Sequence, residues 1–105
     1  MAIKATWGYT RTLRRLDESC LMEVTLHPRQ DYAVPTQARA WAYITVLGGT
    51  LLVSVDQGSL RTVEPGNRLG APPNTQIMVR NQDSKLNCVF TVLLVLTSSN
   101  QGAEA

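Results

Sequence analysis

Few side chains in this sequence are suited to acid–base chemistry, and three of them lie close together. His27 is the only histidine, and Asp31 and Tyr32 follow it within five positions. A histidine base and a tyrosine acid within hydrogen-bond reach of a substrate can exchange protons with it without a metal. His27 precedes Pro28 in a predicted loop, so an exposed or capping role for the histidine is the alternative.

A metal centre is not expected from this set of residues. Catalytic sites for Zn, Fe, Mn or Ni need about three or four imidazole or carboxylate donors that converge on one point. The two cysteines, Cys20 and Cys88, have neither zinc-site spacing nor the number needed for a disulfide scaffold. Both lie among apolar strand residues, which favours buried thiols and leaves a cross-strand disulfide or a reactive cysteine as alternatives. We therefore expect no metal and no cofactor.

Length and charge exclude other classes of function. The 105 residues suffice for one domain with one core. Ten basic and eight acidic residues are mixed along the chain, whereas a nucleic-acid binder shows a basic stripe with little acid beside it. No apolar segment is long enough to span a bilayer, and the first ten residues lack the apolar region of a secretory signal. We expect a cytoplasmic protein with no nucleic-acid or membrane partner.

Short alternating segments between glycine and proline turns predict an all-β fold, with a β domain over residues 1–98 and a flexible tail over 99–105. The clearest strand, 39–47, places alanine, isoleucine and valine on one face and Trp41, Tyr43 and Leu47 on the other. Two turns are specified in detail: a positive φ is expected at Gly58, and Glu64-Pro65-Gly66 fits a type II turn. The further strands are expected at 3–9, 10–16, 20–26, 31–37, 51–55, 59–63, 67–71, 76–81 and 87–96.

The segment from 66 to 81 resembles the second motif of the cupin family, G-x5-P-x-G-x2-H-x3-N. Gly66, Pro72 and Asn81 match it. Asn74 replaces a glycine and tolerates left-handed backbone angles. Ile77 stands in place of the histidine. The structural part of the motif is thus present and its metal ligand is missing.

The first cupin motif ends in a glutamate, six residues and a glycine, and Val46-Leu47-Gly48-Gly49 fits that ending. The alignment puts Ala42 at the glutamate. The two upstream histidines would fall at Pro35 and Gln37, or at Thr36 and Ala38. The resemblance implies a small single-domain RmlC-like double-stranded β-helix, or jelly-roll, barrel with its metal-binding residues missing. The metal-dependent activities of the family are therefore not carried over.

An interior without metal ligands is apolar, and two interpretations follow. Either side chains fill the barrel lumen, or the lumen binds a small apolar or amphipathic molecule. The candidate ligand-binding residues are Gln37, Ala42, Ile44, Ile77 and Val79. The polar groups that could orient a ligand at the mouth are Gln37, Tyr43, Arg80 and His27.

Two other classes of function are open. Some cupin-like sugar epimerases use a histidine base and a tyrosine acid without metal, and His27 with Tyr32 is the corresponding hypothesis. The third class is a protein that acts through an interaction surface. Trp7, Trp41 and Tyr43 are more large apolar side chains than a monomer usually exposes to solvent. Small cupins commonly pair through N-terminal strands, so the resemblance implies a homodimer that buries Trp41 or Trp7.

Overall fold

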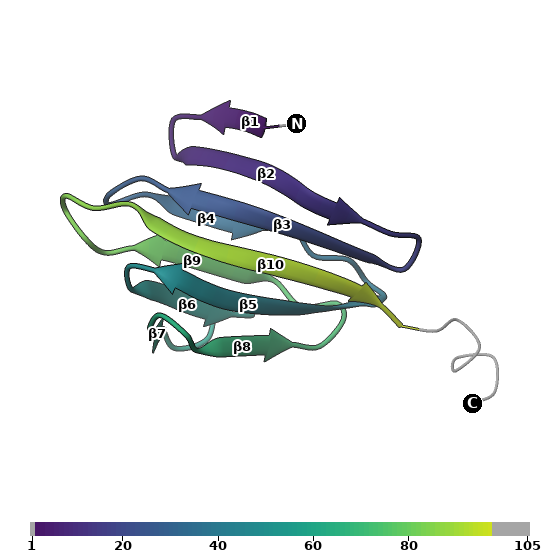
Figure 1. The fold of residues 1–105 in the computed structure, drawn as a ribbon. Coiled ribbons are helices and arrows are strands. Elements are labelled where there is room, and N and C mark those ends of the chain that lie inside the picture. The colour runs from purple at the N-terminus through teal and green to yellow at the C-terminus, as the bar shows by residue number, and fades with distance from the viewer. Residues whose placement is uncertain (1, 98–105) are drawn as a thin grey trace.

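The computed structural model describes residues 2–97, with side chains from residue 5 onward. The described part consists of ten strands and no helix, as Figure 1 shows, so it holds no helix long and apolar enough to cross a membrane. The strands are β1 (Ala2–Ala5), β2 (Gly8–Arg15), β3 (Ser19–Leu26), β4 (Asp31–Val34), β5 (Ala40–Gly48), β6 (Leu51–Val55), β7 (Arg61–Val63), β8 (Arg68–Ala71), β9 (Ile77–Asn81) and β10 (Cys88–Leu96).

The strands form two antiparallel sheets of unequal width. The larger has the order β1-β2-β3-β10-β5-β8 and the smaller the order β4-β9-β6-β7. In Figure 1 the larger sheet lies in front of the smaller one, and β1 and β2 extend past β4, the edge strand of the sheet behind. Among residues 2–97, no strand of the smaller sheet therefore lies opposite the inner face of β2.

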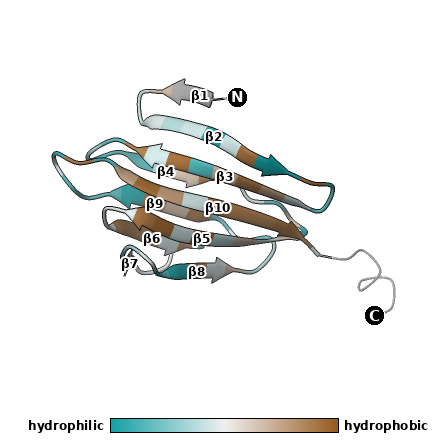
Figure 2. Cartoon of the chain, viewed as in Figure 1, coloured by the Kyte–Doolittle hydropathy of each residue, from teal (hydrophilic) through white to brown (hydrophobic). Residues whose placement is uncertain are grey.

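The core lies between the sheets and follows the two-residue period of the strands. On β10 the buried positions alternate from Cys88 through Phe90 and Val92 to Leu94. Figure 2 shows β10 as the most continuously apolar strand of the front sheet, whereas β2 is mostly pale or hydrophilic with one hydrophobic band near its end. The predicted inward face of β5 is confirmed, since its residues are at most 2% exposed: Ala40, Ala42, Ile44 and Val46.

The turns confirm one expectation and correct another. Gly66 has φ 88° and the N–H of Asn67 bonds to the carbonyl of Glu64 at 3.0 Å, as in the predicted type II turn. The expected positive φ at Gly58 is wrong, because the positive angles fall on Asp56 (51°) and Gln57 (61°). A type I′ turn needs φ > 0 at both central residues, and here it spans residues 55–58.

The N-terminal segment also differs from expectation. Instead of one strand over 3–9, the chain turns after Ala5 and β2 begins at Gly8. Gly8 has φ 147°, and a Cβ there would lie 2.0 Å from the carbonyl oxygen of Thr25, so only glycine lets β2 approach β3 so closely. The strand expected at 10–16 is confirmed by β2. The predicted tail, 99–105, lies outside the described residues, so its flexibility and the domain boundary stay predictions.

Backbone geometry explains why the motif survives in part. Asn74 has φ 63°, which is the left-handed region that asparagine tolerates in place of glycine. Gly49, at the end of the first motif, has φ 84°, and a Cβ there would lie 3.1 Å from the Cα of Cys88. These positions shape the chain, and they persist without the metal ligands.

Candidate functional site

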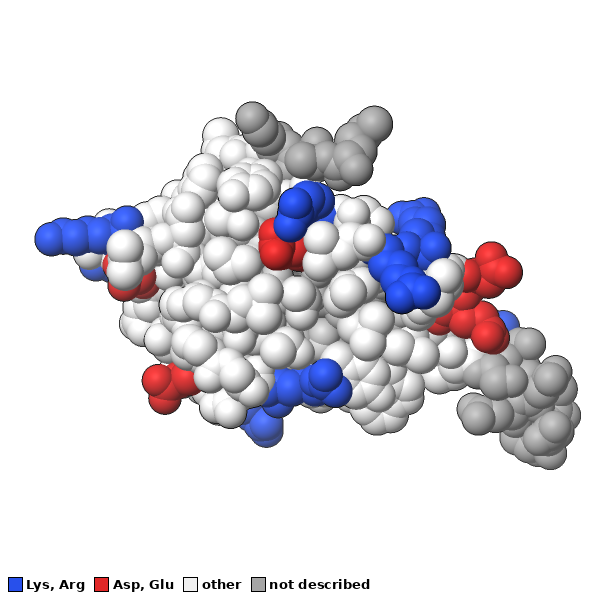
Figure 3. Space-filling view, viewed as in Figure 1, with Lys and Arg blue, Asp and Glu red and all other residues white. Residues whose placement is uncertain are grey.

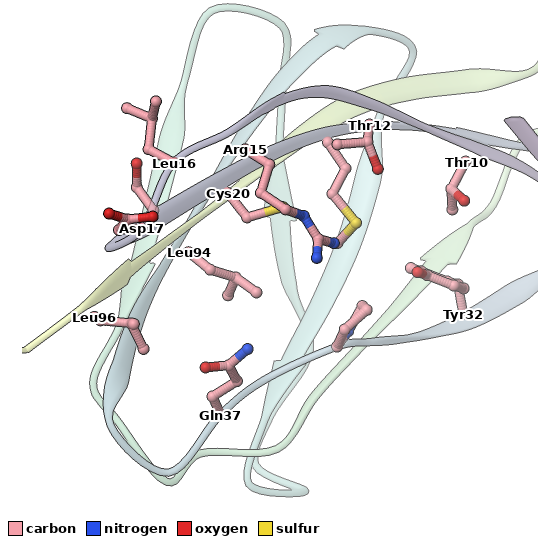
Figure 4. Close-up of a pocket in the computed structure, with 13 residues that line it drawn as sticks. Thr10, Thr12, Arg15, Leu16, Asp17, Cys20, Tyr32, Gln37, Leu94 and Leu96 are labelled. Atoms are coloured by element: carbon pink, nitrogen blue, oxygen red, sulfur yellow. The ribbon is translucent and has the colours of Figure 1, made fainter. Parts of the chain in front are cut away.

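A pocket of about 490 Å³ opens where β2 and β3 extend past the smaller sheet. Its second wall is the segment that joins β4 to β5, and the end of β10 closes it (Figure 4). The lining residues are Thr10, Thr12, Arg15, Leu16, Asp17, Ser19, Cys20, Met22, Tyr32, Pro35, Gln37, Leu94 and Leu96. The volume is within the range of roughly 300–1,000 Å³ typical of small-molecule sites.

The pocket has apolar walls and polar groups at separate positions. Met22 and Leu94 supply apolar surface from neighbouring strands, since Val92 pairs with Met22 and Leu94 with Cys20. Figure 4 shows the head group of Arg15 over the middle of the pocket, with the amide of Gln37 on the opposite wall. Such a surface suits a molecule with both an apolar and a polar part.

Tyr32 connects the pocket with the core. Its ring lies 4.3 Å from that of Trp7 and 6.5 Å from that of Phe90, measured between centroids. Burial raises the pKa of the Tyr32 phenol above its ordinary value, which keeps the hydroxyl protonated at neutral pH. Tyr32 therefore offers the pocket a neutral hydroxyl.

The predicted lumen residues are divided by the structure. Gln37 lines the pocket. The other four, Ala42, Ile44, Ile77 and Val79, are at most 2% exposed and belong to the hydrophobic core between the sheets. Leu94, whose backbone pairs with Ala42, forms the wall between that core and the pocket.

The positions of the family's metal ligands do not fit a metal ion. Ala42 and Ile77 carry no donor atom and are packed among apolar side chains. Within the described side chains, no three His, Cys, Asp or Glu residues lie close enough to hold one. Of the two alignments left open for the upstream histidines, Pro35 and Gln37 face this pocket, and neither side chain is a metal ligand of the kind the family uses.

The two thiols occupy different environments. Cys20 is half-buried and lines the pocket, whereas Cys88 is fully buried, and burial raises its pKa to about 11. Both are free. They stand six positions apart along the β3–β10 ladder, since Leu26 pairs with Cys88 and Cys20 with Leu94. That separation, about 20 Å at the rise of a strand, excludes a disulfide between them in this fold.

The acid–base group expected around His27 is not assembled at the pocket. Tyr32 lines it, but His27 does not, and its ring lies 6.5 Å from that of Tyr9. Asp31 forms an ion pair with Arg80 at 2.6 Å on the outer side of the smaller sheet. The hydrogen bond from Arg80 lowers the pKa of the Asp31 carboxyl. The structure thus places Arg80 away from the pocket mouth as well.

The residues predicted for a dimer interface have different surroundings. Trp7 packs against Tyr32 within the chain. Trp41 and Tyr43 stack on the outer face of β5, with ring centroids 6.2 Å apart and planes at 15°, and Arg68 lies 5.9 Å from the Tyr43 centroid. Trp41 is 39% exposed. Figure 3 shows this face of the molecule with much of its middle uncharged and its charged groups mostly nearer the margins.

Sequence reasoning missed the β2 contribution to the pocket. Thr10, Thr12 and Arg15 lie on a strand whose alternation is weak, and nothing in the sequence says that β2 lacks a strand opposite it. Cys20 and Met22 share one face of β3 with the buried Val24 and Leu26, so the pocket and the core lie along the same face of that strand. The available signal was the polar character of Thr10, Thr12 and Arg15, which indicates a face outside the core but does not say which strands lie opposite it.

Comparison with known proteins shows the fold. No family model matches the sequence, and no curated protein matches it. Among solved structures, KdgF from Halomonas sp. is 12% identical with a TM-score of 0.75, over 92% of this chain and 86% of that one. The Cupin_2 domain of an XRE family transcriptional regulator from Enterobacter cloacae is 17% identical with a TM-score of 0.76, over 85% and 96%.

A third likeness is to an uncharacterized conserved protein with a double-stranded β-helix domain from Klebsiella pneumoniae. It is 15% identical with a TM-score of 0.78, over 87% of this chain and 78% of that one. At these identities the likeness concerns fold alone. The chain has the all-β, double-stranded β-helix fold of cupins, which confirms the expectation from its sequence.

Proposed function

We propose that this chain, with its cupin fold, is a binding module that holds a small molecule in the pocket between β2, β3 and the β4–β5 segment. The observation that carries the proposal is the pocket of about 490 Å³, with apolar walls and a few polar groups. Ligand sites typically combine these properties. The proposal includes binding without a metal, because Ala42 and Ile77 lack donor atoms.

The pocket lies beside the region first expected from the sequence. The side chains of Ile44, Ile77 and Val79 pack the space between the sheets and support the pocket wall formed by Leu94. Gln37 is the predicted residue that faces a ligand directly. Two free thiols suit a reducing compartment, which supports the cytoplasmic location expected from the sequence.

The geometry favours binding over catalysis. A general base must reach its substrate directly or through one water, and His27 is not among the pocket residues. Asp31 is engaged by Arg80. A metal-independent epimerase that uses His27 would therefore need a different site.

The outer face of β5 supports a second proposal, that the chain forms a homodimer. Trp41 and Leu47 are 39% and 53% exposed on that face, beside the half-buried Tyr43. Burial of apolar surface stabilises association by about 25 cal/mol per Å² before the costs of association are counted. A second copy of the chain covers these groups in the proposed dimer.

The binding proposal is tested by screening metabolites for two effects on the full chain. A ligand raises the melting temperature, since at about 100 times its Kd it adds roughly 2.7 kcal/mol, and it slows alkylation of Cys20. The variant Thr12→Trp, which fills the pocket from β2, loses both effects. Leu13→Trp, on the same strand but not lining the pocket, is the control and retains them. A screen in which no compound protects Cys20 contradicts the proposal.

A further inference from the structure

The geometry points to a specific ligand class for this pocket: a monocarboxylate with an apolar body, its carboxylate bound by Arg15. The inference rests on the proposed function and specifies it. It concerns a residue that no motif of the sequence singles out, on the strand that extends past the smaller sheet.

Arg15 is the cationic side chain among the pocket residues, and its position suits an anion. Figure 4 draws its guanidinium over the middle of the pocket, above Leu94 and across from Gln37. Guanidinium groups bind carboxylates through two parallel N–H···O bonds, which fix orientation as well as affinity. The amide of Gln37 supplies a neutral donor on the opposite wall.

The charges around Arg15 leave its head group available to a ligand. The ion pairs of the described side chains join Arg11 to Glu23 and Arg80 to Asp31, and neither includes Arg15. Asp17 is the acidic residue of the pocket lining. Figure 4 places its carboxylate at the rim beside Leu16, well apart from the Arg15 head group.

The composition of the lining selects a monoanion over a phosphate. A phosphate dianion is bound by several cations or by a cluster of backbone N–H groups, whereas this pocket offers one cationic side chain. Met22, Leu94 and Leu96 are apolar residues of the lining and match an aliphatic or aromatic body. One positive charge above an apolar surface is complementary to an amphipathic carboxylate.

The test compares three probes with the same apolar tail: octanoate, 1-octanol and octylamine. Each is titrated against the full chain, and its Kd is read from the protection of Cys20 against N-ethylmaleimide, while unmodified Cys88 shows that the chain stays folded. In the unmodified protein octanoate binds at least about tenfold tighter than 1-octanol. One charge-assisted hydrogen-bonded contact accounts for a difference of this size in Kd. Octylamine binds more weakly than either.

Variants at two neighbouring arginines test whether Arg15 causes the preference for octanoate over 1-octanol. Arg15→Gln removes the preference for octanoate and leaves the affinity for 1-octanol unchanged, whereas Arg15→Lys restores part of it. Arg14→Gln makes the same change in net charge on the same strand but does not line the pocket, so it retains the preference. Protection is expressed relative to each variant without probe, because Arg15 is paired with Cys20 and its replacement changes the surroundings of that thiol.

The outcomes separate this inference from the proposed function. Equal affinity for octanoate and 1-octanol, unchanged by Arg15→Gln, overturns the carboxylate assignment while binding itself stands. If none of the three probes and no compound of the metabolite screen protects Cys20, both the carboxylate inference and the proposed binding function are overturned. Cys20 protection that rises with protein concentration alone shows that a second copy of the chain fills the pocket, which also overturns the inference.

Discussion

The side-chain amide of Asn81 donates a hydrogen bond to the backbone carbonyl of Leu26 at 3.0 Å, and so joins β9 of the smaller sheet to the end of β3 in the larger one. The same amide nitrogen donates to the carbonyl of Leu86 at 2.8 Å, and its oxygen accepts a bond from the N–H of Asp83 at 3.0 Å. Asn81 is 1% exposed. The motif asparagine thus has a structural role that is independent of any metal.

Asn81→Ala is expected to lower the free energy of unfolding by about 2–4 kcal/mol, because it leaves buried backbone groups without partners. Urea denaturation measures the change. Asn67→Ala, at an exposed position, serves as the control and changes stability by less than about 0.5 kcal/mol. Equal stability of the two variants would show that the three bonds contribute nothing net.

The ion pair of Asp31 and Arg80 gives the protein a pH-dependent increment of stability. The pKa of Asp31 is lower in the folded chain than its ordinary value of 3.8, chiefly through the hydrogen bond from Arg80. The increment is therefore fully present above the unfolded pKa and is lost as the pH falls through the lower folded one. Because both side chains are about half exposed, solvent screens the pair and the increment is small.

Asp31→Asn tests this linkage. The variant melts below the unmodified protein at about pH 6, and the difference shrinks as the pH falls through the lowered folded pKa of Asp31, below which this carboxyl is protonated in the folded and the unfolded chain alike. Melting temperatures at several pH values measure it. Glu64→Gln, an exposed carboxyl without an ion pair among the described side chains, is the control and shows no such convergence. A constant difference across the range contradicts the assignment.

The two thiols are expected to react at very different rates. At neutral pH N-ethylmaleimide modifies Cys20, which is accessible from the pocket, while Cys88 stays unmodified because burial both shields it and raises its pKa to about 11. Mass spectrometry of peptides gives both rates. In denaturant the two cysteines react alike. Rapid modification of Cys88 in the folded protein would show that the core opens far more often than this packing allows.

The proposed dimer predicts a mass of two chains by light scattering at micromolar concentration. Trp41→Glu combined with Leu47→Glu places charges on the outer face of β5 and returns the mass to one chain, since a buried unpaired charge strongly disfavours association. Leu60→Glu, at a site 58% exposed outside that face, leaves the dimer intact. A one-chain mass for the unmodified protein contradicts the proposal.

Much of the fold could be predicted because strands and tight turns depend on local chemistry. The alternation around Ala42 predicts which face of β5 is buried, and the sequence around Gly66 predicts a type II turn. The positive φ at Asp56 and Gln57 was missed because a glycine next to them was the simpler candidate. The sequence of a turn indicates which of its residues most easily adopt a positive φ. The pairing of the flanking strands, however, selects the turn type and so decides which residues do.

The pocket could be predicted only in part, because it depends on which strands face each other. Gln37 was identified from its place in the motif, whereas Met22 was not predicted as a pocket residue. Arg15 was not, since its role follows from the smaller sheet ending at β4, short of β2. The widths of two sheets are set by contacts between distant parts of the chain, which one strand's sequence does not reveal.

Because the two sheets differ in width, the residues of β2 that line the pocket are distinct from the core residues that stabilise the fold. The hydrophobic core of the described chain contains no residue of β2, so replacing Thr10 or Thr12 has little influence on folding. Replacing Phe90 or Val92 has a large one. The ligand selectivity of the proposed pocket can therefore be altered from β2, by evolution or by design, while the buried core that stabilises the fold stays unchanged.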